Sequence, residues 1–262
     1  MDLKDISNQV ATIARKTGAY IKAEAKGITL QRAAYKGIND LVTYVDKESE
    51  RRIVEELSQI LPEADILAEE GNYKSKNSNL KWIIDPLDGT TNFVHGIPAY
   101  AISIALVEND IPIVAVVFDV EREECFTAYS RGGSFLNNEK IEVSKSQNLS
   151  ECLMATGFPV TTFDKSSLLL QITESFIRET HGVRRIGSAA LDLAYVSCGR
   201  FEGFFEYNLN AWDVAAGVLL VKEAGGFVSD FKGENNYLFG KEILAANAAH
   251  PEMLKLISKD WK

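Results

Sequence analysis

The sequence predicts a layered α+β or α/β protein in which helices pack against sheets. Three observations support this fold class. Apolar residues recur at helical spacing within residues 1–60, short β-rich apolar runs follow as far as residue 141, and strands and helices alternate in the remainder. The chain has 262 residues, of which 46% are hydrophobic and 25% are charged. This length is enough for one large domain or for two closely packed halves.

Two amphipathic helices begin the chain. Apolar residues recur every three or four positions over about 3–25 and again over about 43–60, and Pro62 ends the second helix. The segments that follow are short, apolar and rich in β-branched residues, which is typical of strands. We expect strands at 64–68, 80–87, 99–107 and 112–120, a hairpin connection at 108–112, and further strands within 124–141.

The second half of the chain alternates between strands and helices. We expect strands at 183–186, 201–207, 227–231 and 242–247, and helices at 189–199, 211–224 and 251–261. Gly225 and Gly226 follow the second of these helices and supply the positive φ that often ends a helix. The polar stretch 144–150 divides an N-terminal α+β half (1–145) from a C-terminal α/β half (146–262), and we expect the halves to form one compact unit.

Charge and composition argue against several classes of protein. The formal net charge is −9 and the chain has no basic cluster, so we expect no primary role in nucleic-acid binding. Cys125, Cys152 and Cys198 are scattered, which disfavours a zinc site or a disulfide framework and indicates reduced thiols in a cytoplasmic protein. No apolar run approaches the roughly 18 residues of a membrane span, so we expect no membrane partner.

The segment Trp-Ile-Ile-Asp-Pro-Leu-Asp-Gly-Thr-Thr-Asn (82–92) carries an apolar strand directly into a cluster of oxygen ligands. Pro86 prevents a regular helix at Asp85, so both Asp85 and Asp88 can turn onto one cation together with the Leu87 carbonyl. Hard oxygen ligands of this kind suit Mg²⁺. The following Gly-Thr-Thr-Asn could begin a helix whose N–H groups hold a phosphate.

Two alternatives to a metal site fit the same segment. Pro, Asp, Gly and Asn are common turn residues, so the segment could be a surface turn. Haloacid-dehalogenase phosphatases have Asp-x-Asp-Gly-Thr after an apolar strand. Asp85 and Asp88 are separated by one residue too many for that motif, which disfavours this second alternative.

Further polar residues lie at similar junctions between elements. Glu69 ends an apolar run, Asp213 lies at the start of a helix, and Glu206 ends the run Phe-Phe-Glu. Taken singly, Asp213 could stabilise a helix dipole and Glu206 could be a solvated strand end. Lys36 and Asp46 could equally lie in a loop and on an exposed helix face. Their joint occurrence with Asp85 and Asp88 favours one site.

Two long motifs give the chain a family resemblance. Residues 82–93 (Trp-Ile-Ile-Asp-Pro-Leu-Asp-Gly-Thr-Thr-Asn-Phe) resemble the first signature of the inositol monophosphatase family, and 212–217 (Trp-Asp-Val-Ala-Ala-Gly) with 223–226 resemble the second. Segments 36–46, 68–70 and 187–190 occur in the family's order. The resemblance covers nearly the whole chain and is closest to the bacterial branch. It implies a sandwich of alternating α-β-α-β-α layers, as in inositol monophosphatases and fructose-1,6-bisphosphatases.

The resemblance also implies a magnesium-dependent active site. The metal ligands would be Glu69, Asp85, the Leu87 carbonyl, Asp88 and Asp213, holding two or three Mg²⁺ ions per chain. Two carboxylates about 4 Å apart repel each other by roughly 4 kcal/mol at an effective dielectric constant near 20. Several carboxylates in one site therefore need divalent cations to stay ionised.

Catalytic and substrate-binding roles follow from the same resemblance. Glu69, Thr90, Asp46 and Lys36 would be catalytic, with Thr90 hydrogen-bonded to Asp46 so that it positions the attacking water. The substrate-binding residues would be Asp88, Gly89, Thr90, Gly187, Ser188, Ala189, Glu206 and Asp213. The second metal ion would stabilise the leaving oxygen in an in-line displacement.

The implied reaction is Mg²⁺-dependent hydrolysis of myo-inositol 1-phosphate. Fructose 1,6-bisphosphate, histidinol phosphate, NADP and 3′-phosphoadenosine nucleotides are alternative substrates within the family. The sequence shows no obvious basic group for a second phosphate, which favours monophosphates. A metal-binding interaction protein of the same fold is an alternative of another class. The resemblance further implies a homodimer and inhibition by lithium.

Overall fold

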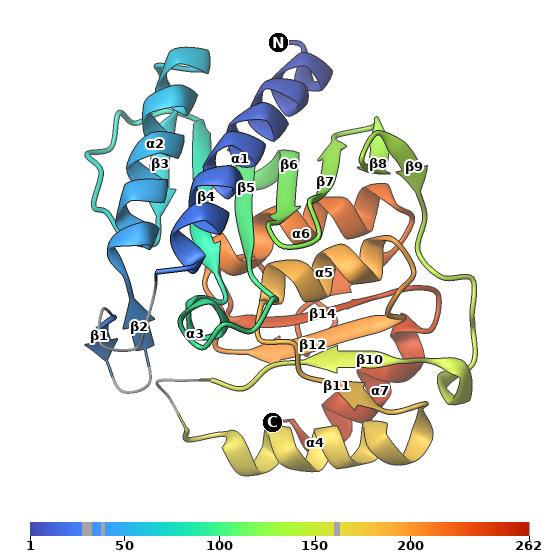
Figure 1. The fold of residues 1–262 in the computed structure, drawn as a ribbon. Coiled ribbons are helices and arrows are strands. Elements are labelled where there is room, and N and C mark those ends of the chain that lie inside the picture. Colours follow the sequence, from blue (N-terminus) through green and yellow to red (C-terminus); the bar gives the residue numbers. More distant parts are fainter. Residues whose placement is uncertain (28–32, 38–39, 160–162, 262) are drawn as a thin grey trace.

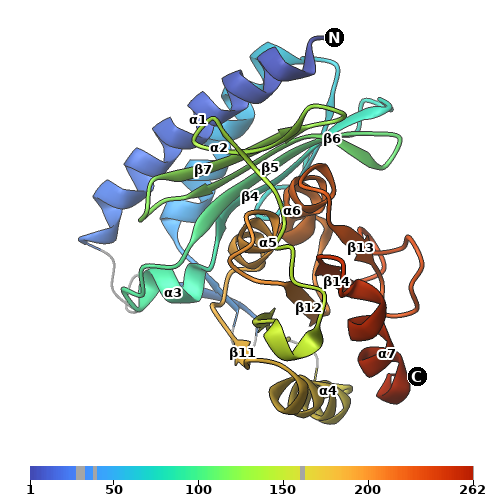
Figure 2. The same ribbon diagram turned by 90° about the vertical axis from the view of Figure 1, so that its right-hand side faces the viewer.

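Helices and sheets alternate in five layers in the computed structural model, which describes residues 1–27, 33–37, 40–159 and 163–261. Helices α1 (Leu3–Ala25) and α2 (Tyr44–Ile60) cover one face of a seven-stranded sheet, and α5 (Ala189–Ser197) and α6 (Ala211–Glu223) lie between this sheet and a five-stranded one (Figures 1 and 2). Helices α4 (Ser166–Glu179) and α7 (His250–Asp260) form the outermost layer. This arrangement confirms the predicted α-β-α-β-α sandwich.

The seven-stranded sheet is buried on both faces. Its order is β3-β4-β5-β6-β7-β8-β9, with β3 parallel to β4 and the other neighbours antiparallel. Ile83 and Val117 face the α5–α6 layer, whereas Ile84 and Val116 face α1 and α2. Burial on both faces explains why the sequence shows continuous apolar runs instead of alternation. The strands are β3 (Asp65–Ala68), β4 (Leu80–Asp88), β5 (Ala101–Glu108), β6 (Ile111–Asp119), β7 (Glu124–Tyr129), β8 (Gly133–Leu136) and β9 (Glu139–Ile141).

The five-stranded sheet has the order β11-β10-β12-β14-β13. Its strands are β10 (Met154–Thr156), β11 (Val183–Arg184), β12 (Gly203–Tyr207), β13 (Phe227–Ser229) and β14 (Glu242–Ala246). Strand β10 runs parallel to β11 and β12, while β14 is antiparallel to β12 and β13. On β12, Phe204 packs toward α5 and α6, and Phe205 packs toward α4 and α7. This sheet therefore shares one hydrophobic cluster with the first.

Local sequence signals account for the element ends that bear on function. The predicted hairpin joins β5 to β6 through Asn109 and Asp110, whose φ angles of 50° and 62° suit the tight turn between antiparallel strands. Helix α2 begins with a capping box, in which Val45 N donates to Thr43 Oγ1 at 3.0 Å and Thr43 N donates to Asp46 Oδ2 at 2.8 Å. Asp46 is thereby fixed in the first turn and only 1% exposed.

Several elements were not predicted from the sequence. They are α4, β10, a short hairpin of β1 (Ala34–Gly37) and β2 (Asp40–Val42), and the 3₁₀ turn Leu149–Glu151. The two hairpin strands and β10 are too short to give a periodic signal. In α4, Leu169, Ile172 and Phe176 are buried at three- and four-residue spacing, so this helix could have been recognised. None of the helices in the described part of the chain has the length and apolar character that crossing a lipid bilayer requires.

Candidate active site

A cavity of about 350 Å³ lies where the ends of β4, α3 (Thr90–Val94), α5, α6 and β12 meet. Its walls include Glu69, Asp85, Leu87, Asp88, Gly89, Thr90, Gly187, Ser188, Ala189, Glu206 and Asp213, all of which the sequence marked as site residues. Asp46 lies behind this wall and is hydrogen-bonded to Thr90. Lys36 belongs to β1, and its side chain is outside the described part of the chain.

Strand β4 carries two aspartates to the cavity through a bulge. Asp85 pairs with Ser103 and Asp88 pairs with Ala101, so β4 has one residue more than β5 between these points. Pro86 lies within the bulge, where its missing N–H disturbs the ladder least. Residues three apart on a regular strand point to opposite faces, so the bulge is what lets both carboxylates reach one cavity.

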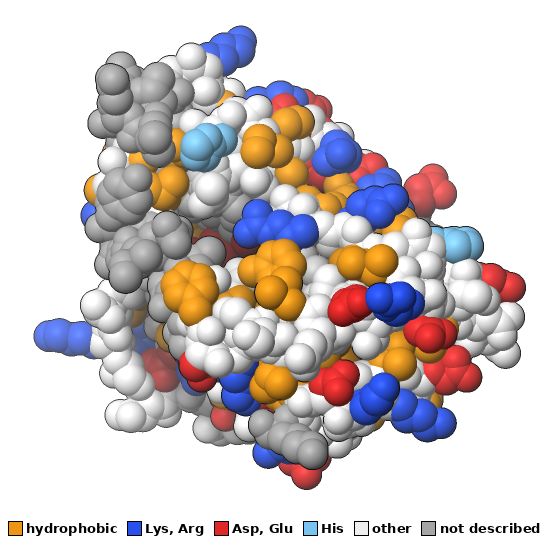
Figure 3. Space-filling model, turned by 90° about the horizontal axis from the view of Figure 1, so that it is seen from below, with side chains coloured by type: hydrophobic (Ala, Val, Ile, Leu, Met, Phe, Trp, Pro, Cys, Tyr) orange, Lys and Arg blue, Asp and Glu red, His pale blue; other side chains and the backbone are white. Residues whose placement is uncertain are grey.

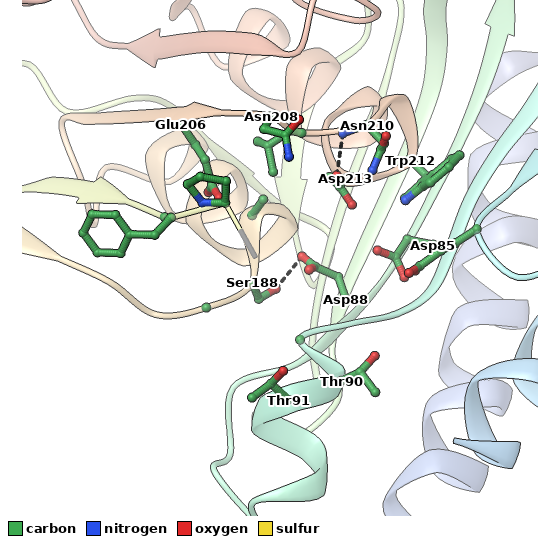
Figure 4. A pocket seen from close by; sticks show the side chains of 18 of the residues that line it. Asp85, Asp88, Thr90, Thr91, Ser188, Glu206, Asn208, Asn210, Trp212 and Asp213 are labelled. Atoms are coloured by element: carbon green, nitrogen blue, oxygen red, sulfur yellow. Dashed lines mark hydrogen bonds between the residues drawn. The ribbon is translucent and has the colours of Figure 1, made fainter. Parts of the chain in front are cut away.

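Helix α5 fixes the Asp88 carboxylate. Asp88 Oδ2 accepts hydrogen bonds from Ser188 Oγ at 2.7 Å and from Ala190 N at 2.7 Å. Ser188 is also the N-cap of α5, where its Oγ accepts from Leu191 N at 3.3 Å. Figure 4 shows the Asp88–Ser188 contact at the edge of the cavity. The loop before α5 and the end of β4 are thus held together by one carboxylate.

The other two cavity aspartates are each fixed by a backbone N–H. Asp85 Oδ1 accepts from Leu87 N at 3.0 Å within the bulge. Asp213 Oδ2 accepts from Asn210 N at 2.6 Å, in the capping box that begins α6. One oxygen of each carboxylate is thereby held in place. In Figure 4 the carboxylates of Asp85, Asp88 and Asp213 point toward the same region of the cavity.

The carboxyl groups of the cavity wall are buried and lie near one another, which disfavours their ionised forms. Asp85 is 2% exposed, and burial together with the charges of the neighbouring carboxylates raises its pKa well above the usual value. Burial, and then the charge of Asp88, raises the pKa of Asp213 in the same way. Burial raises the pKa of Asp88 to about 6. Burial and the charge of Asp88 raise the pKa of Glu206 to about 8.

The donor set fits divalent cations of the Mg²⁺ type. Carboxylate oxygens are the ligands that Mg²⁺ prefers, and a divalent cation would offset the repulsion that raises these pKa values. The side chains line a common wall without closing into a finished coordination shell. Within the described residues, no group of three His, Cys, Asp or Glu side chains is already placed to ligate one ion.

Stabilisation by Mg²⁺ is expected to depend on pH. In the metal-free protein the raised pKa values of Asp88 (about 6) and Glu206 (about 8) mean that folding favours their protonated forms. This contribution to the free energy of unfolding is present below pH 4 and is lost as pH rises through the folded pKa values. Mg²⁺ binds the ionised forms, so the rise in unfolding temperature on adding Mg²⁺ should be larger at pH 8 than at pH 6.

Differential scanning fluorimetry at both pH values, with excess Mg²⁺ and with EDTA, measures this difference. Saturation at 100 times Kd stabilises by about 2.7 kcal/mol, which is about 5 °C or more for a chain of this length. An equal shift at pH 6 and pH 8 would contradict competition between protons and Mg²⁺.

The Thr90 hydroxyl is held between two acceptors. Thr90 Oγ1 lies 2.7 Å from Asp46 Oδ1 and 3.0 Å from the Leu87 carbonyl oxygen. Asp46 Oδ2 also accepts from Thr43 Oγ1 at 2.6 Å. Burial raises the pKa of Asp46, while its bonds to Thr43 and Thr90 oppose that rise. Because both neighbours of Thr90 are acceptors, its hydroxyl hydrogen is directed at one of them and its oxygen can accept a hydrogen bond from water.

Two glycine loops meet at the cavity and are joined by Asn92. Asn92 Nδ2 donates to the carbonyl of Ala99 at 2.8 Å and to that of Ile186 at 2.9 Å. Gly89 has φ 96°, and a Cβ on it would lie 2.9 Å from the Ala99 oxygen and 3.3 Å from the Gly187 oxygen. Position 89 therefore requires glycine. Asn92 lies within the 82–92 motif, but its role as a connector could not be seen without the structure.

Glu50 is a buried residue near the site that sequence reasoning missed. It lies on α2, one helical turn after Asp46, and is 3% exposed. Glu50 Oε2 accepts from Glu70 N at 2.8 Å, and Oε1 accepts from Tyr73 Oη at 2.9 Å. These bonds fix the turn after β3 that carries Glu69 to the cavity wall. The spacing of Asp46 and Glu50 on one helix face was the available signal.

Replacing Glu50 with glutamine is expected to weaken Mg²⁺ binding about tenfold or more, as loss of a partner that orients a metal ligand typically does. Glutamine has no charge and one acceptor oxygen in place of two, so the bonds to Glu70 N and Tyr73 Oη are no longer charge-assisted and are weaker. Isothermal titration calorimetry with Mg²⁺ measures this effect. Tyr73→Phe removes the second bond only and should have a smaller effect. Unchanged Mg²⁺ affinity with a lower unfolding temperature would mean that Glu50 serves stability alone.

Two basic side chains in the cavity wall were also missed. Arg185 and Lys241 both line the cavity, together with Asn208 and Trp212. Arg185 lies next to Gly187, and its charge opposes the rise in the pKa of Glu206. Arg185 has only Arg184 as a basic neighbour in the sequence and Lys241 has none, so no basic cluster marked them. The absence of an obvious basic group was the reason for favouring monophosphates, and this pair weakens that reason.

Known proteins resemble the chain over nearly its whole length. The sequence profile of the inositol monophosphatase family matches residues 2–262. The Nus factor SuhB of Escherichia coli strain K12 is 42% identical over 241 residues, covering 92% of this chain and 90% of that protein. The structure of extragenic suppressor protein suhB from Bartonella henselae has a TM-score of 0.91 and 37% identity, covering 97% of this chain and 99% of that one. The IMPase of Thermotoga maritima has a TM-score of 0.88 and 37% identity, covering 99% and 98%. The chain belongs to the inositol monophosphatase family.

Proposed function

We propose that the protein hydrolyses a phosphate monoester in a Mg²⁺-dependent reaction, with myo-inositol 1-phosphate as its substrate. The main support for this proposal is that the carboxylates of Asp85, Asp88 and Asp213 point toward one region of the cavity. Burial raises the pKa values of all three. The family is generally Mg²⁺-dependent, which agrees with this donor set. The neighbouring hydroxyl of Thr90 supplies a group that can orient water.

Glu69, Asp85, the Leu87 carbonyl, Asp88 and Asp213 would hold the two or three Mg²⁺ ions. When bound, Mg²⁺ supplies Lewis acidity, which lowers the pKa of water and offsets the negative charge on phosphate oxygens. The protein holds one oxygen of each aspartate by a backbone N–H, so the coordinating oxygens are oriented before the ion arrives. The N–H groups of Gly89 and Thr90 would hold phosphate oxygens at the start of α3.

Thr90 and Asp46 would position the attacking water. With its hydrogen directed at Asp46 and the Leu87 carbonyl, Thr90 Oγ1 accepts from water and turns a water lone pair toward phosphorus. The new bond joins water oxygen to phosphorus and the ester P–O bond breaks. The attacking water releases one proton to solvent, and the leaving alkoxide takes one proton from solvent. Lys36 would act near the metals from β1. Glu206, with Gly187, Ser188 and Ala189 on the same wall, would accept hydrogen bonds from substrate hydroxyl groups.

A panel of phosphate monoesters tests the substrate. Purified protein with Mg²⁺ is assayed on inositol 1-phosphate, histidinol phosphate, NADP, a 3′-phosphoadenosine nucleotide and fructose 1,6-bisphosphate, with and without Li⁺. Arg185 and Lys241 are the reason for keeping the bisphosphate in the panel. The highest kcat/KM is expected for inositol 1-phosphate, with inhibition by Li⁺. A higher value for another ester would retain the chemistry and change the substrate.

The E. coli relative favours a second role in transcription, because its name is Nus factor SuhB. A binding role of this kind would use the outer surface, whereas hydrolysis uses the cavity. Asp85→Asn separates the two roles, since Asp85 is buried and contributes nothing to the outer surface. Loss of hydrolysis with retained binding to the transcription machinery would show two independent functions. Loss of both would place binding under control of the metal site.

We further propose that the protein forms a homodimer through the outer layer of helices. On α4, Leu170 and Ile177 lie two helical turns apart, and each is 57% exposed. Figure 3, which views the molecule from this side, shows hydrophobic side chains among charged ones on this face. Sedimentation velocity should give the mass of two chains, and Ile177→Glu should shift it toward one. A monomeric wild-type protein would contradict the proposal.

A further inference from the structure

Gly157 lies beside Glu206 on the neighbouring strand. Strands β10 and β12 run parallel, and their register pairs Thr156 with Phe205. Thr156 Oγ1 also donates to the Phe205 carbonyl at 2.7 Å, which holds the two strands in this register. Gly157 follows Thr156 and Glu206 follows Phe205, and both Gly157 and Glu206 line the cavity.

The missing side chain of Gly157 leaves the space that the Glu206 carboxyl group occupies. A Cβ at position 157 would overlap Cδ and both carboxyl oxygens of Glu206. Gly157 does not have a positive φ, so its backbone conformation is open to other residues. The requirement for glycine at this position therefore comes from the carboxyl group that lies over it.

Shape, more than hydrogen bonding, determines where the Glu206 carboxyl group lies. Glu206 is 8% exposed. In the described part of the chain, no side chain or backbone N–H donates a hydrogen bond to its carboxyl group. Its position depends on the walls around it, of which Gly157 is one. The carboxyl end of a glutamate is flexible, so a methyl group at position 157 would displace it without requiring the strands to move.

We propose that Gly157 is a specificity-determining residue, which positions Glu206 to accept hydrogen bonds from the hydroxyl groups of a polyol phosphate. The proposal rests on the proposed function, in which Glu206 contacts substrate hydroxyls. A displaced Glu206 carboxylate no longer reaches those hydroxyls, but the N–H groups of Gly89 and Thr90, and Mg²⁺ held by the other carboxylates, would still bind the phosphate. The cavity then loses its preference for polyol phosphates over phosphate esters that have no hydroxyl groups.

Gly157→Ala is expected to lower kcat/KM for inositol 1-phosphate by about 10- to 100-fold, the factor that a hydrogen bond to a charged group contributes. The loss for p-nitrophenyl phosphate, which has no hydroxyl groups, should be at least about tenfold smaller. Gly203→Ala is the matched control on β12. Its Cβ would meet the flexible ends of Met154 and Met253, each at 2.7 Å, in the core. It should leave the ratio of the two kcat/KM values unchanged.

Equal losses on both esters in a folded Gly157→Ala protein would overturn the proposal. A wild-type protein that releases phosphate from neither ester would instead overturn the proposed function. If Gly157→Ala does not fold, the double variant Gly157→Ala/Glu206→Ala is compared with Glu206→Ala. Without the Glu206 carboxyl group, the space over position 157 is free for the added methyl group. Adding Gly157→Ala to Glu206→Ala should leave both kcat/KM values unchanged. A further loss on inositol 1-phosphate in this background would show that Gly157 acts independently of Glu206.

Discussion

Asp85→Asn is expected to reduce Mg²⁺-dependent phosphate release by about 10³-fold or more and, at the same time, to raise the unfolding temperature of the metal-free protein at pH 7.5. The loss of activity follows because Asp85 is one of the proposed Mg²⁺ ligands. Removing several kcal/mol of transition-state stabilisation corresponds to a factor of this size. The activity assay and thermal unfolding in EDTA measure the two effects separately.

The gain in metal-free stability follows from the raised pKa of Asp85. Burial and the neighbouring carboxylates raise this pKa in the folded state, so ionising Asp85 lowers the free energy of unfolding as pH rises through the folded value. Asparagine has the same shape and no charge, so this loss disappears. One kcal/mol corresponds to about 2–4 °C in a chain of this size. The difference from wild type should vanish at pH 4, where Asp85 is protonated.

Asp119→Asn is the matched control for Asp85→Asn. Asp119 is fully buried, but it accepts from Tyr195 Oη at 2.8 Å and forms an ion pair with Arg122 at 3.2 Å, away from the cavity wall. Its replacement should lower stability and leave Mg²⁺-dependent activity nearly unchanged. If Asp85→Asn also destabilised the metal-free protein, the repulsion among the cavity carboxylates would be compensated by something other than a metal ion.

Thr90→Val should reduce kcat by about 10²- to 10³-fold, while the Mg²⁺ concentration that gives half-maximal activity stays unchanged. Valine has nearly the same shape but no hydroxyl oxygen, so it cannot accept the hydrogen bond that would orient water. Steady-state kinetics with inositol 1-phosphate at saturating Mg²⁺ measures the change. Substrate binding depends on other groups, so KM should change little.

Thr90→Ser is the control for this substitution. Serine retains the hydroxyl that lies 2.7 Å from Asp46 Oδ1 and 3.0 Å from the Leu87 carbonyl, so most of kcat should be recovered. Asp46→Asn should resemble Thr90→Val, since the amide group of asparagine no longer guarantees an acceptor for the Thr90 hydrogen. An increase in KM with unchanged kcat in Thr90→Val would contradict a role in positioning water.

The carboxylate-lined part of the cavity wall could be predicted from the sequence because its residues come in unbroken motifs. Asp85, Leu87 and Asp88 follow one another at the end of an apolar strand, and the structure places all three on the cavity wall. What the sequence could not show is how they turn to one side. The bulge in β4 arises from pairing with β5, and register with a partner strand is a tertiary property.

Residues whose proposed roles depend on packing between distant elements were harder to predict. Glu50 was missed although it lies on the same helix face as Asp46, because its partners on the turn after β3 are twenty or more residues away. Gly157 was missed because a single glycine carries no pattern, and its neighbour Glu206 lies on another strand. Strand β10 is only three residues long, so nothing indicated this pairing.

The most direct test of the metal-dependent site is one Mg²⁺ titration with two readouts. Mg²⁺ is added to the EDTA-treated protein, and binding is followed by calorimetry while phosphate release from inositol 1-phosphate is measured under the same conditions. We expect no release in EDTA and a rise in release that follows occupancy of the carboxylate site. Mg²⁺ binding to the folded protein without release of phosphate, or release that persists in EDTA, would contradict this expectation.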